Sequence, residues 1–148
     1  MANPLLVGID LAHHENVVCL LDSQGAEVGK RFTTANSRPG THQLVDHLLA
    51  VLSDGAFDAV RIAAEATGWY WFPCFQALYQ DPRLQAWPVT LYALNPRLPA
   101  KHAQTFSDLD KTDLNDALVI ADHLRTARTL PRPFQGPPPR LALRLLTR

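Results

Sequence analysis

The spacing of apolar and polar positions along the chain predicts an alternation of strands and helices. Strands typically follow short apolar or alternating runs, whereas helices place apolar residues three and four positions apart. We therefore expect strands within 5–10, 15–22, 28–34, 57–68 and 87–96. We expect helices within 37–53, 69–80 and 113–130, and a short helix or irregular segment at 97–106.

The resulting order is β-β-β-α-β-α-β-α, which predicts an α/β fold. Three strands in a meander followed by alternating helices and strands give a mixed five-stranded sheet with helices on both faces. This is the order of a ribonuclease-H-like domain. Thr41 is the expected cap of the first helix, and Pro73 is tolerable if it lies in the first turn of the second.

The same pattern predicts where the domain ends. We expect residues 1–130 to form it, because the proline-rich stretch "PRPFQGPPPR" follows and predicts an extended linker. The stretch "RLALRLLTR" then begins a new amphipathic helix that breaks off inside its pattern. We therefore interpret residues 131–148 as a linker and a truncated helix that lead to a missing C-terminal domain.

Composition excludes several classes of protein. The chain has 148 residues, of which 47% are hydrophobic and 19% charged, which is typical of one globular domain. It has neither a signal peptide nor an apolar run of about 18 residues, so we expect no membrane partner. Cys19 and Cys74 lie in apolar surroundings and predict buried free thiols in a reducing cytoplasm.

The formal net charge of +0 hides a segregation of charge along the chain. Up to Leu124 there are 14 acids and 8 bases, a balance of −6, and from Arg125 onwards there are 6 arginines and no acid. The basic tail is a candidate segment for contact with phosphates or a partner. A solvated linker explains it equally well.

Four acidic residues follow the predicted elements in a suggestive way. Asp10 and Glu65 each end an apolar strand, and in a sheet of this order those two strands are parallel neighbours. Ligand sites in such sheets lie outside the carboxyl ends of the strands. Asp113 and Asp116 are three residues apart on the last helix and therefore share one face of it.

Clustered carboxylates repel one another unless they are protonated or neutralised. Mg²⁺ or Mn²⁺ is the natural counter-charge, and two such ions about 3.5–4 Å apart can stabilise both oxygens of a phosphodiester displacement. Each acid also has a simpler explanation. Asp113 could cap the helix, Asp116 could be a favourable first-turn charge, and Asp10 and Glu65 could each close a strand.

Four segments resemble one known family. The segments "VGIDLAHHENVVCLLD", "AAEATGWYW", "LNPRLPAKHAQTF" and "KTDLNDALVIADHL" are similar to the N-terminal DEDD domain of the insertion-sequence family one-ten transposases. That domain is RuvC-like and belongs to the ribonuclease-H superfamily. The resemblance covers about residues 5–130, and it implies that Asp10, Glu65, Asp113 and Asp116 bind divalent metal.

The resemblance also implies a function and partners. The family carries out DNA recombination, in which a mobile element is excised and inserted under the direction of a structured guide RNA. We therefore expect DNA and RNA partners, a homo-oligomer in the full-length protein, and action at the nucleoid of the bacterial cytoplasm. The family's second domain carries a serine implicated in strand attack, so we expect this chain alone to be inactive in recombination.

Other residues are weaker candidates. Lys111, Tyr70, Arg97 and Lys101 are candidate contacts to nucleic acid, although a helical surface explains the last two equally well. For the aromatic run 69–72 core packing is the favoured explanation. Family members commonly carry a lysine where this chain has His13 and His14, which we expect to face solvent. We expect the remaining acids of the last acidic stretch to be solvated charges: Asp108, Asp110 and Asp122.

Three alternative functions remain open. A stand-alone structure-specific nuclease would have the same fold and the same acids. An actin-like ATPase or sugar kinase also begins with a strand and an aspartate, but it needs glycine and threonine next, where this chain has Leu11 and Ala12. A catalytically idle scaffold that binds nucleic acid would retain the fold without using the acids.

Overall fold

The computed structural model describes residues 3–95 and 113–136, with the side chains of 113–115 excepted. The elements follow the predicted order, with one short 3₁₀ turn added before the last strand. They are β1 (Pro4–Leu11), β2 (Glu15–Leu21), β3 (Phe32–Ala35), α1 (Arg38–Leu52), β4 (Ala59–Glu65), α2 (Trp71–Gln80), η1 (Leu84–Ala86), β5 (Val89–Leu94) and α4 (Asp113–Thr126). The segments predicted at 97–106 and 140–148 lie outside the described residues.

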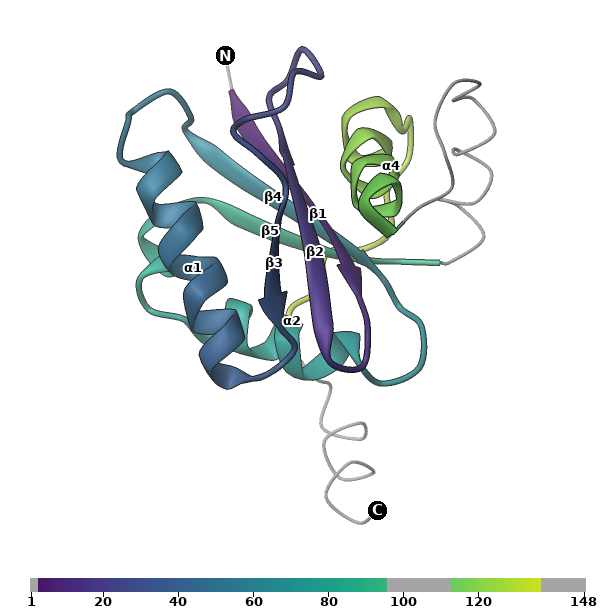
Figure 1. The fold of residues 1–148 in the computed structure, drawn as a ribbon. Helices are drawn as coiled ribbons and strands as arrows, with labels where there is room; N and C mark the ends of the chain where they lie inside the picture. The colour runs from purple at the N-terminus through teal and green to yellow at the C-terminus, as the bar shows by residue number, and fades with distance from the viewer. Residues whose placement is uncertain (1–2, 96–112, 137–148) are drawn as a thin grey trace.

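The five strands form one mixed sheet in the order β3-β2-β1-β4-β5. The strands β1, β2 and β3 pair antiparallel, whereas β1, β4 and β5 run parallel. Figure 1 shows α1 and α2 on one face of the sheet and α4 on the other. The prediction that the first and fourth strands are parallel neighbours is therefore confirmed.

Large side chains fill the space between the sheet and the pair α1 and α2. Every second residue of β1 points to this side, where it meets the buried stripes of both helices. Phe75 is fully buried at the centre of α2. The fully buried members from the strands and α1 include Leu5, Val7, Ile9, Leu44, Leu48 and Ile62.

Small residues line the contact between the sheet and α4. Ala63, Ala117 and Ala121 are fully buried there. A Cβ atom added to Gly8 would lie 2.3 Å from the carbonyl oxygen of Ala117 and 2.5 Å from the amide nitrogen of Ala121. Only glycine therefore allows the backbone of α4 to approach the middle of β1 this closely.

The first helix begins earlier than its predicted cap. Ser37 occupies the N-cap position and its Oγ accepts a hydrogen bond of 3.2 Å from the backbone N–H of Gly40. Thr41 is buried inside the helix, where its hydroxyl lies 4.0 Å from Sγ of Cys74. The expectation that Thr41 caps the helix is wrong, because an extended Ser one turn earlier satisfies the free N–H group.

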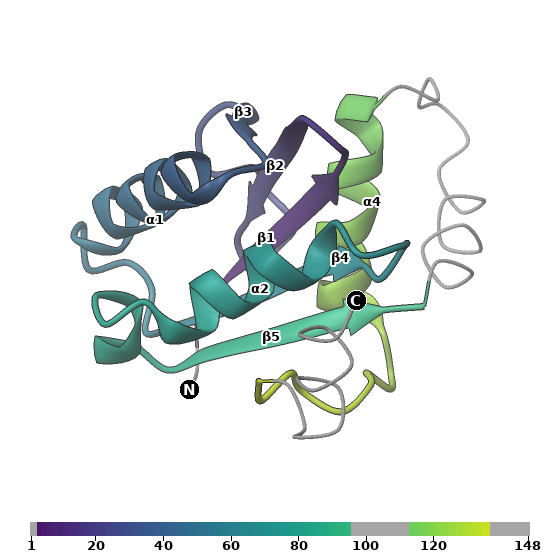
Figure 2. The ribbon, with the colours of Figure 1, turned by 90° about the horizontal axis from the view of Figure 1, so that it is seen from below.

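The chain after α4 returns to the sheet across the open edge of β5 (Figure 2). The backbone N–H of Phe134 donates a 2.7 Å hydrogen bond to the carbonyl of Leu91. Its ring packs against four aromatic rings of α2, which belong to Trp71, Phe72, Phe75 and Tyr79. One of the first residues of the predicted linker is thus anchored to the domain, and residues 131–135 form neither helix nor strand.

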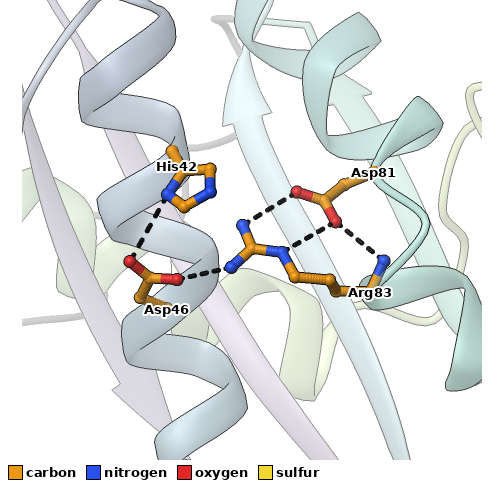
Figure 3. A network of polar contacts seen from close by, with 4 residues as sticks. All are labelled: His42, Asp46, Asp81 and Arg83. Carbon is orange, nitrogen blue, oxygen red and sulfur yellow. Dashed lines mark hydrogen bonds and ion pairs between the residues drawn. The ribbon is translucent and has the colours of Figure 1, made fainter.

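An ionic network joins α1 to the turn after α2 (Figure 3). Arg83 contacts Asp46 of α1 and donates to both carboxylate oxygens of Asp81 at 3.3 and 3.2 Å. Asp46 is also 3.4 Å from Nδ1 of His42. Burial alone would raise the pKa of Asp81, but the hydrogen bonds and charge of Arg83 outweigh it and hold that pKa below its usual value.

Both cysteines are buried free thiols, as predicted, and they lie on opposite faces of the sheet. Burial raises the pKa of Cys19 and of Cys74 to about 11, so both remain protonated near neutral pH. In the ranges 3–95 and 113–136, no helix is long and apolar enough to cross a bilayer.

Candidate functional site

Asp10 is the last residue but one of β1 and Glu65 is the last residue of the adjacent strand β4, at the same edge of the sheet. Ile9 pairs with Ala64 in the parallel register, so the next residues along the two strands are Asp10 and Glu65. Neighbouring strands lie about 4.8 Å apart. The predicted juxtaposition of these two carboxylates is therefore present in the backbone.

Both side chains lie on the face that α4 covers. Side chains alternate along a strand, and Gly8 of β1 and Ala63 of β4 contact or border α4. Asp10 and Glu65 stand two residues further along the same strands, and both are half-buried. The apolar part of this face thus ends in two acids at the carboxyl ends of β1 and β4.

The last helix begins near this edge and runs back along β1. Its middle contacts Gly8 through Ala117 and Ala121, and its last turn reaches Gly25, which lies against the guanidinium of Arg125. The first turn of α4, with Asp113 and Asp116, therefore lies toward the carboxyl end of β1. The side chain of Asp113 is outside the described part of the structure.

The charge of Asp116 interacts electrostatically with Glu65. Burial raises the pKa of Glu65 above its usual value, and repulsion from Asp116 raises it further. These residues are about 50 positions apart in the chain and come from the sheet and the helix, so only folding brings them together. A carboxylate in this position gains from any cation that joins it.

The described carboxylates do not by themselves make a complete metal cage. Among the side chains that the structure describes, no three of His, Cys, Asp or Glu are arranged to hold a metal ion. Asp10, Glu65 and Asp116 have the oxygen donors that Mg²⁺ prefers. The predicted fourth ligand, Asp113, is one helical turn from Asp116.

The weaker candidates have mixed outcomes. Lys111, Arg97 and Lys101 lie outside the described residues, as do Asp108 and Asp110. The expectation of core packing for the aromatic run is confirmed for Trp71 and Phe72, which lie in or against the core, and is wrong for the two residues before them. Within the run 69–72 the side chains of Trp69 and Tyr70 are 49% and 45% exposed, because they occupy the turn before α2 and not the helix.

Asp122 is not a solvated charge, contrary to our expectation. Only 9% of its surface is exposed, and Oδ1 accepts from Nε of Arg125 at 2.8 Å. The helical periodicity placed it off the face of Asp116. Periodicity does not reveal that a nearby arginine compensates a buried carboxylate.

A second feature escaped the sequence interpretation. A hollow of about 510 Å³ opens between the amino ends of α1 and α2, and we call it the α1–α2 hollow. Residues of α1 and α2 line it together with residues of three turns, namely His13 after β1, Asn36 and Ser37 after β3, and Trp69 and Tyr70 after β4. The exposed aromatic pair was the only sequence signal for it.

Comparison with known proteins supports this fold. Residues 7–148 match the model of the IS110-type DEDD family, whose description is "Transposase". T. thermophilus RuvC, in a complex with a Holliday junction substrate, has 16% identity and a TM-score of 0.56, over 88% of this chain and 99% of that chain. EutJ, an ethanolamine utilization protein from Carboxydothermus hydrogenoformans, has 17% identity and a TM-score of 0.43, over 71% of this chain and 42% of that chain. No curated protein matches in sequence.

Proposed function

The chain belongs to the IS110-type DEDD transposases, and from this premise we propose that it is the metal-binding catalytic part of a longer protein that cleaves and transfers DNA strands. Asp10, Glu65, Asp113 and Asp116 would hold two Mg²⁺ or Mn²⁺ ions at the carboxyl edge of the sheet. When bound, these ions stabilise the attacking and leaving oxygens of the phosphodiester. The surrounding strands and α4 hold the carboxylates in position.

One observation carries this proposal. Burial raises the pKa of Glu65, and repulsion from Asp116 across the junction of sheet and helix raises this pKa further. Asp10 stands beside Glu65 in the register of the sheet. Acids that only cap a helix or close a strand have no need to converge from three separate elements.

The remaining parts of the proposal follow from membership of the family. We infer that a structured guide RNA directs the longer protein to its DNA in the bacterial cytoplasm, and that this protein acts as a homo-oligomer. The serine for strand attack belongs to a second domain. The 148-residue chain should therefore bind metal but not complete strand transfer.

Metal binding tests the proposal directly. Isothermal titration of the purified chain with Mn²⁺ should show binding that is lost in Asp10→Asn, Glu65→Gln and Asp116→Asn. Asp54→Asn is the matched control, because Asp54 is an exposed acid in the turn after α1, at the opposite end of the sheet. Its Mn²⁺ affinity should equal that of the unchanged protein.

A second measurement connects metal to DNA chemistry. The same substitutions in the longer protein should abolish recombination while far-ultraviolet circular dichroism and the melting temperature remain those of a folded protein. Recombination at the unchanged rate in these variants would leave only the scaffold interpretation. Strand transfer by the 148-residue chain alone would contradict the need for a second domain.

A further inference from the structure

We propose that the α1–α2 hollow binds an unpaired nucleotide of DNA. This nucleotide lies a few positions along the same strand from the phosphodiester at which the acids act. The inference rests on the proposed function, because it identifies the occupant by its closeness to the acidic edge. The reasons to expect nucleotide binding, however, come from the residues that line the hollow.

The hollow and the acids share one edge of the sheet but lie on its two faces. His13 follows Asp10 by three residues, and Trp69 follows Glu65 by four. A chain of three or four residues spans at most about 10–14 Å. A DNA strand rises about 3.4 Å per stacked nucleotide, so the two sites are a few nucleotides apart.

The surface of the hollow is suited to a base. Trp69 and Tyr70 are both half-exposed at its rim. The ring of His13 packs edge-on to Tyr70 with 5.3 Å between ring centroids, which holds the tyrosine in place. Exposed aromatic faces on which bases stack are a recurring means of binding single-stranded nucleic acid.

Polar groups and charge complete the match. Arg38 lines the hollow together with the amide side chains of Asn36, Gln76 and Gln80, and none of its lining residues is Asp or Glu. Amides can donate to and accept from base edges, and a guanidinium suits a phosphate. The acid-free hollow therefore contrasts with the acidic edge across the sheet, and it suits a nucleotide better than a metal ion.

The rim is also held in a fixed shape. Nδ2 of Asn36 donates to the carbonyl of Ala12 at 2.8 Å, and the backbone N–H of Asn36 donates to the carbonyl of His14 at 2.9 Å. These bonds fasten the turn after β1 to the turn before α1. A pre-formed site loses little conformational freedom when it binds its ligand.

Binding of single-stranded DNA to the 148-residue chain tests the inference. The probe is a fluorescein-labelled oligothymidylate of about eight nucleotides, a length within the range of known single-strand sites. Anisotropy is measured in EDTA, so that metal bound at the acids does not contribute. Tyr70→Ala should weaken binding about 5- to 150-fold, which corresponds to the loss of one stacked base. Tyr70→Phe should bind like the unchanged protein.

The chain offers a matched control for each substitution. Tyr79 is 43% exposed on α2, the helix that follows Tyr70, but lines a different hollow, so Tyr79→Ala should leave DNA affinity unchanged. Arg61 is an exposed arginine near the start of β4, so Arg61→Ala should not reproduce the loss expected from Arg38→Ala. An oligonucleotide with abasic positions should bind as weakly as DNA binds to Tyr70→Ala.

Each contrary outcome has a distinct meaning. Equal affinity of Tyr70→Ala and the unchanged protein would overturn the inference, and so would equal binding of abasic DNA. Tighter binding of the matching RNA through Tyr70 and Arg38 would overturn the assignment to DNA. Loss of Mn²⁺ binding by the acids would leave this test unaffected, because a failed metal site and a failed hollow give separate readouts.

Discussion

The two faces of the sheet pack against their helices with side chains of different size. On the face of α1 and α2, large side chains interdigitate, with Phe75 fully buried at the centre. On the face of α4, Gly8 and three alanines bring the helix backbone against β1. The first face buries much more side-chain volume, whereas the second brings acidic residues close to one another.

This difference explains where repulsion is tolerated. Large side chains separate a helix from a sheet, whereas glycine and alanine let it come close. The close approach brings the first turn of α4 to the carboxyl ends of β1 and β4, where burial and, to a smaller extent, repulsion from Asp116 raise the pKa of Glu65. The large buried side chains on the face of α1 and α2 stabilise the fold and offset the repulsion between Asp116 and Glu65.

The largest expected effect is on the packed face. Phe75→Ala should lower the free energy of unfolding by about 3–5 kcal/mol, because it removes a fully buried ring and leaves a cavity. Urea denaturation measures the loss. Tyr79→Ala on the same helix is the control and should cost much less, since Tyr79 is largely exposed. Similar losses in both variants would contradict the assignment of the main core to this face.

A smaller change should break the close approach of α4. Gly8→Ala places a Cβ atom against the backbone of Ala117 and Ala121, and backbone atoms cannot rotate away. We expect a loss of about 1–3 kcal/mol by urea denaturation. The Mn²⁺ affinity should fall as well, because α4 carries two of the proposed ligands.

The control for this substitution separates space from backbone conformation. Gly29 has a φ of +73° and nothing within 4 Å of an added Cβ. Gly29→Ala should therefore cost about 1–2 kcal/mol for the left-handed conformation alone, and Mn²⁺ affinity should not change. Equal Mn²⁺ affinity in Gly8→Ala and Gly29→Ala would show that the approach of α4 is irrelevant to the acids.

The ionic network of the packed face predicts a modest pH dependence. Arg83 lowers the pKa of Asp81, so its contribution to stability is complete above about pH 3.9, the unfolded value. The contribution is lost as pH falls through the lower pKa of the folded state. Asp81→Asn should lower the melting temperature by roughly 1–3 °C at pH 7. The difference should vanish near pH 2, and a constant difference would exclude ionisation as its cause.

The smallest effect has the opposite sign and belongs to the α4 face. Because the pKa of Glu65 is raised in the folded protein, protonation of this carboxyl favours folding. This contribution to stability is complete below about pH 4.3, the pKa of the unfolded state. It is lost as pH rises through the higher pKa of the folded state. In EDTA at pH 7, Glu65→Gln should therefore have a slightly higher melting temperature than the unchanged protein. The gain in free energy of unfolding should be less than about 1 kcal/mol after solvent screening.

Calorimetry at two pH values and with Mn²⁺ checks this prediction. The advantage of Glu65→Gln should shrink at pH 4, where the unchanged carboxyl is itself mostly neutral. Added Mn²⁺ should stabilise the unchanged protein more than the variant, because a ligand that binds the folded state raises its stability. A variant that is less stable than the unchanged protein in EDTA at pH 7 would contradict the repulsion.

Local patterns predicted the elements and part of the site. The apolar runs that end in Asp10 and Glu65 are strands, and their parallel adjacency followed from the order of elements. The three-residue spacing of Asp113 and Asp116 lies on a helix, as expected. The metal-binding role of these acids stays a prediction.

Other features depend on neighbours that are distant in the chain. Asp122 is buried because Arg125 compensates it, and Phe134 is anchored because the aromatic side of α2 accepts its ring. Tyr70 is exposed although its sequence neighbours are apolar. The residue type was informative in each case. Whether the side chain is buried or exposed, however, depends on contacts with residues that are distant in the chain.

The sequence by itself determined the period of each segment, and with it the order of strands and helices that predicts a RuvC-like α/β fold. It also placed acids at the ends of two strands and at the start of a helix, because these positions are local. Only the tertiary structure decided that α4 packs closely against Gly8, that burial and Asp116 raise the pKa of Glu65, and that three turns and two helices form a hollow. Those outcomes depend on distances between elements, which local periodicity does not contain.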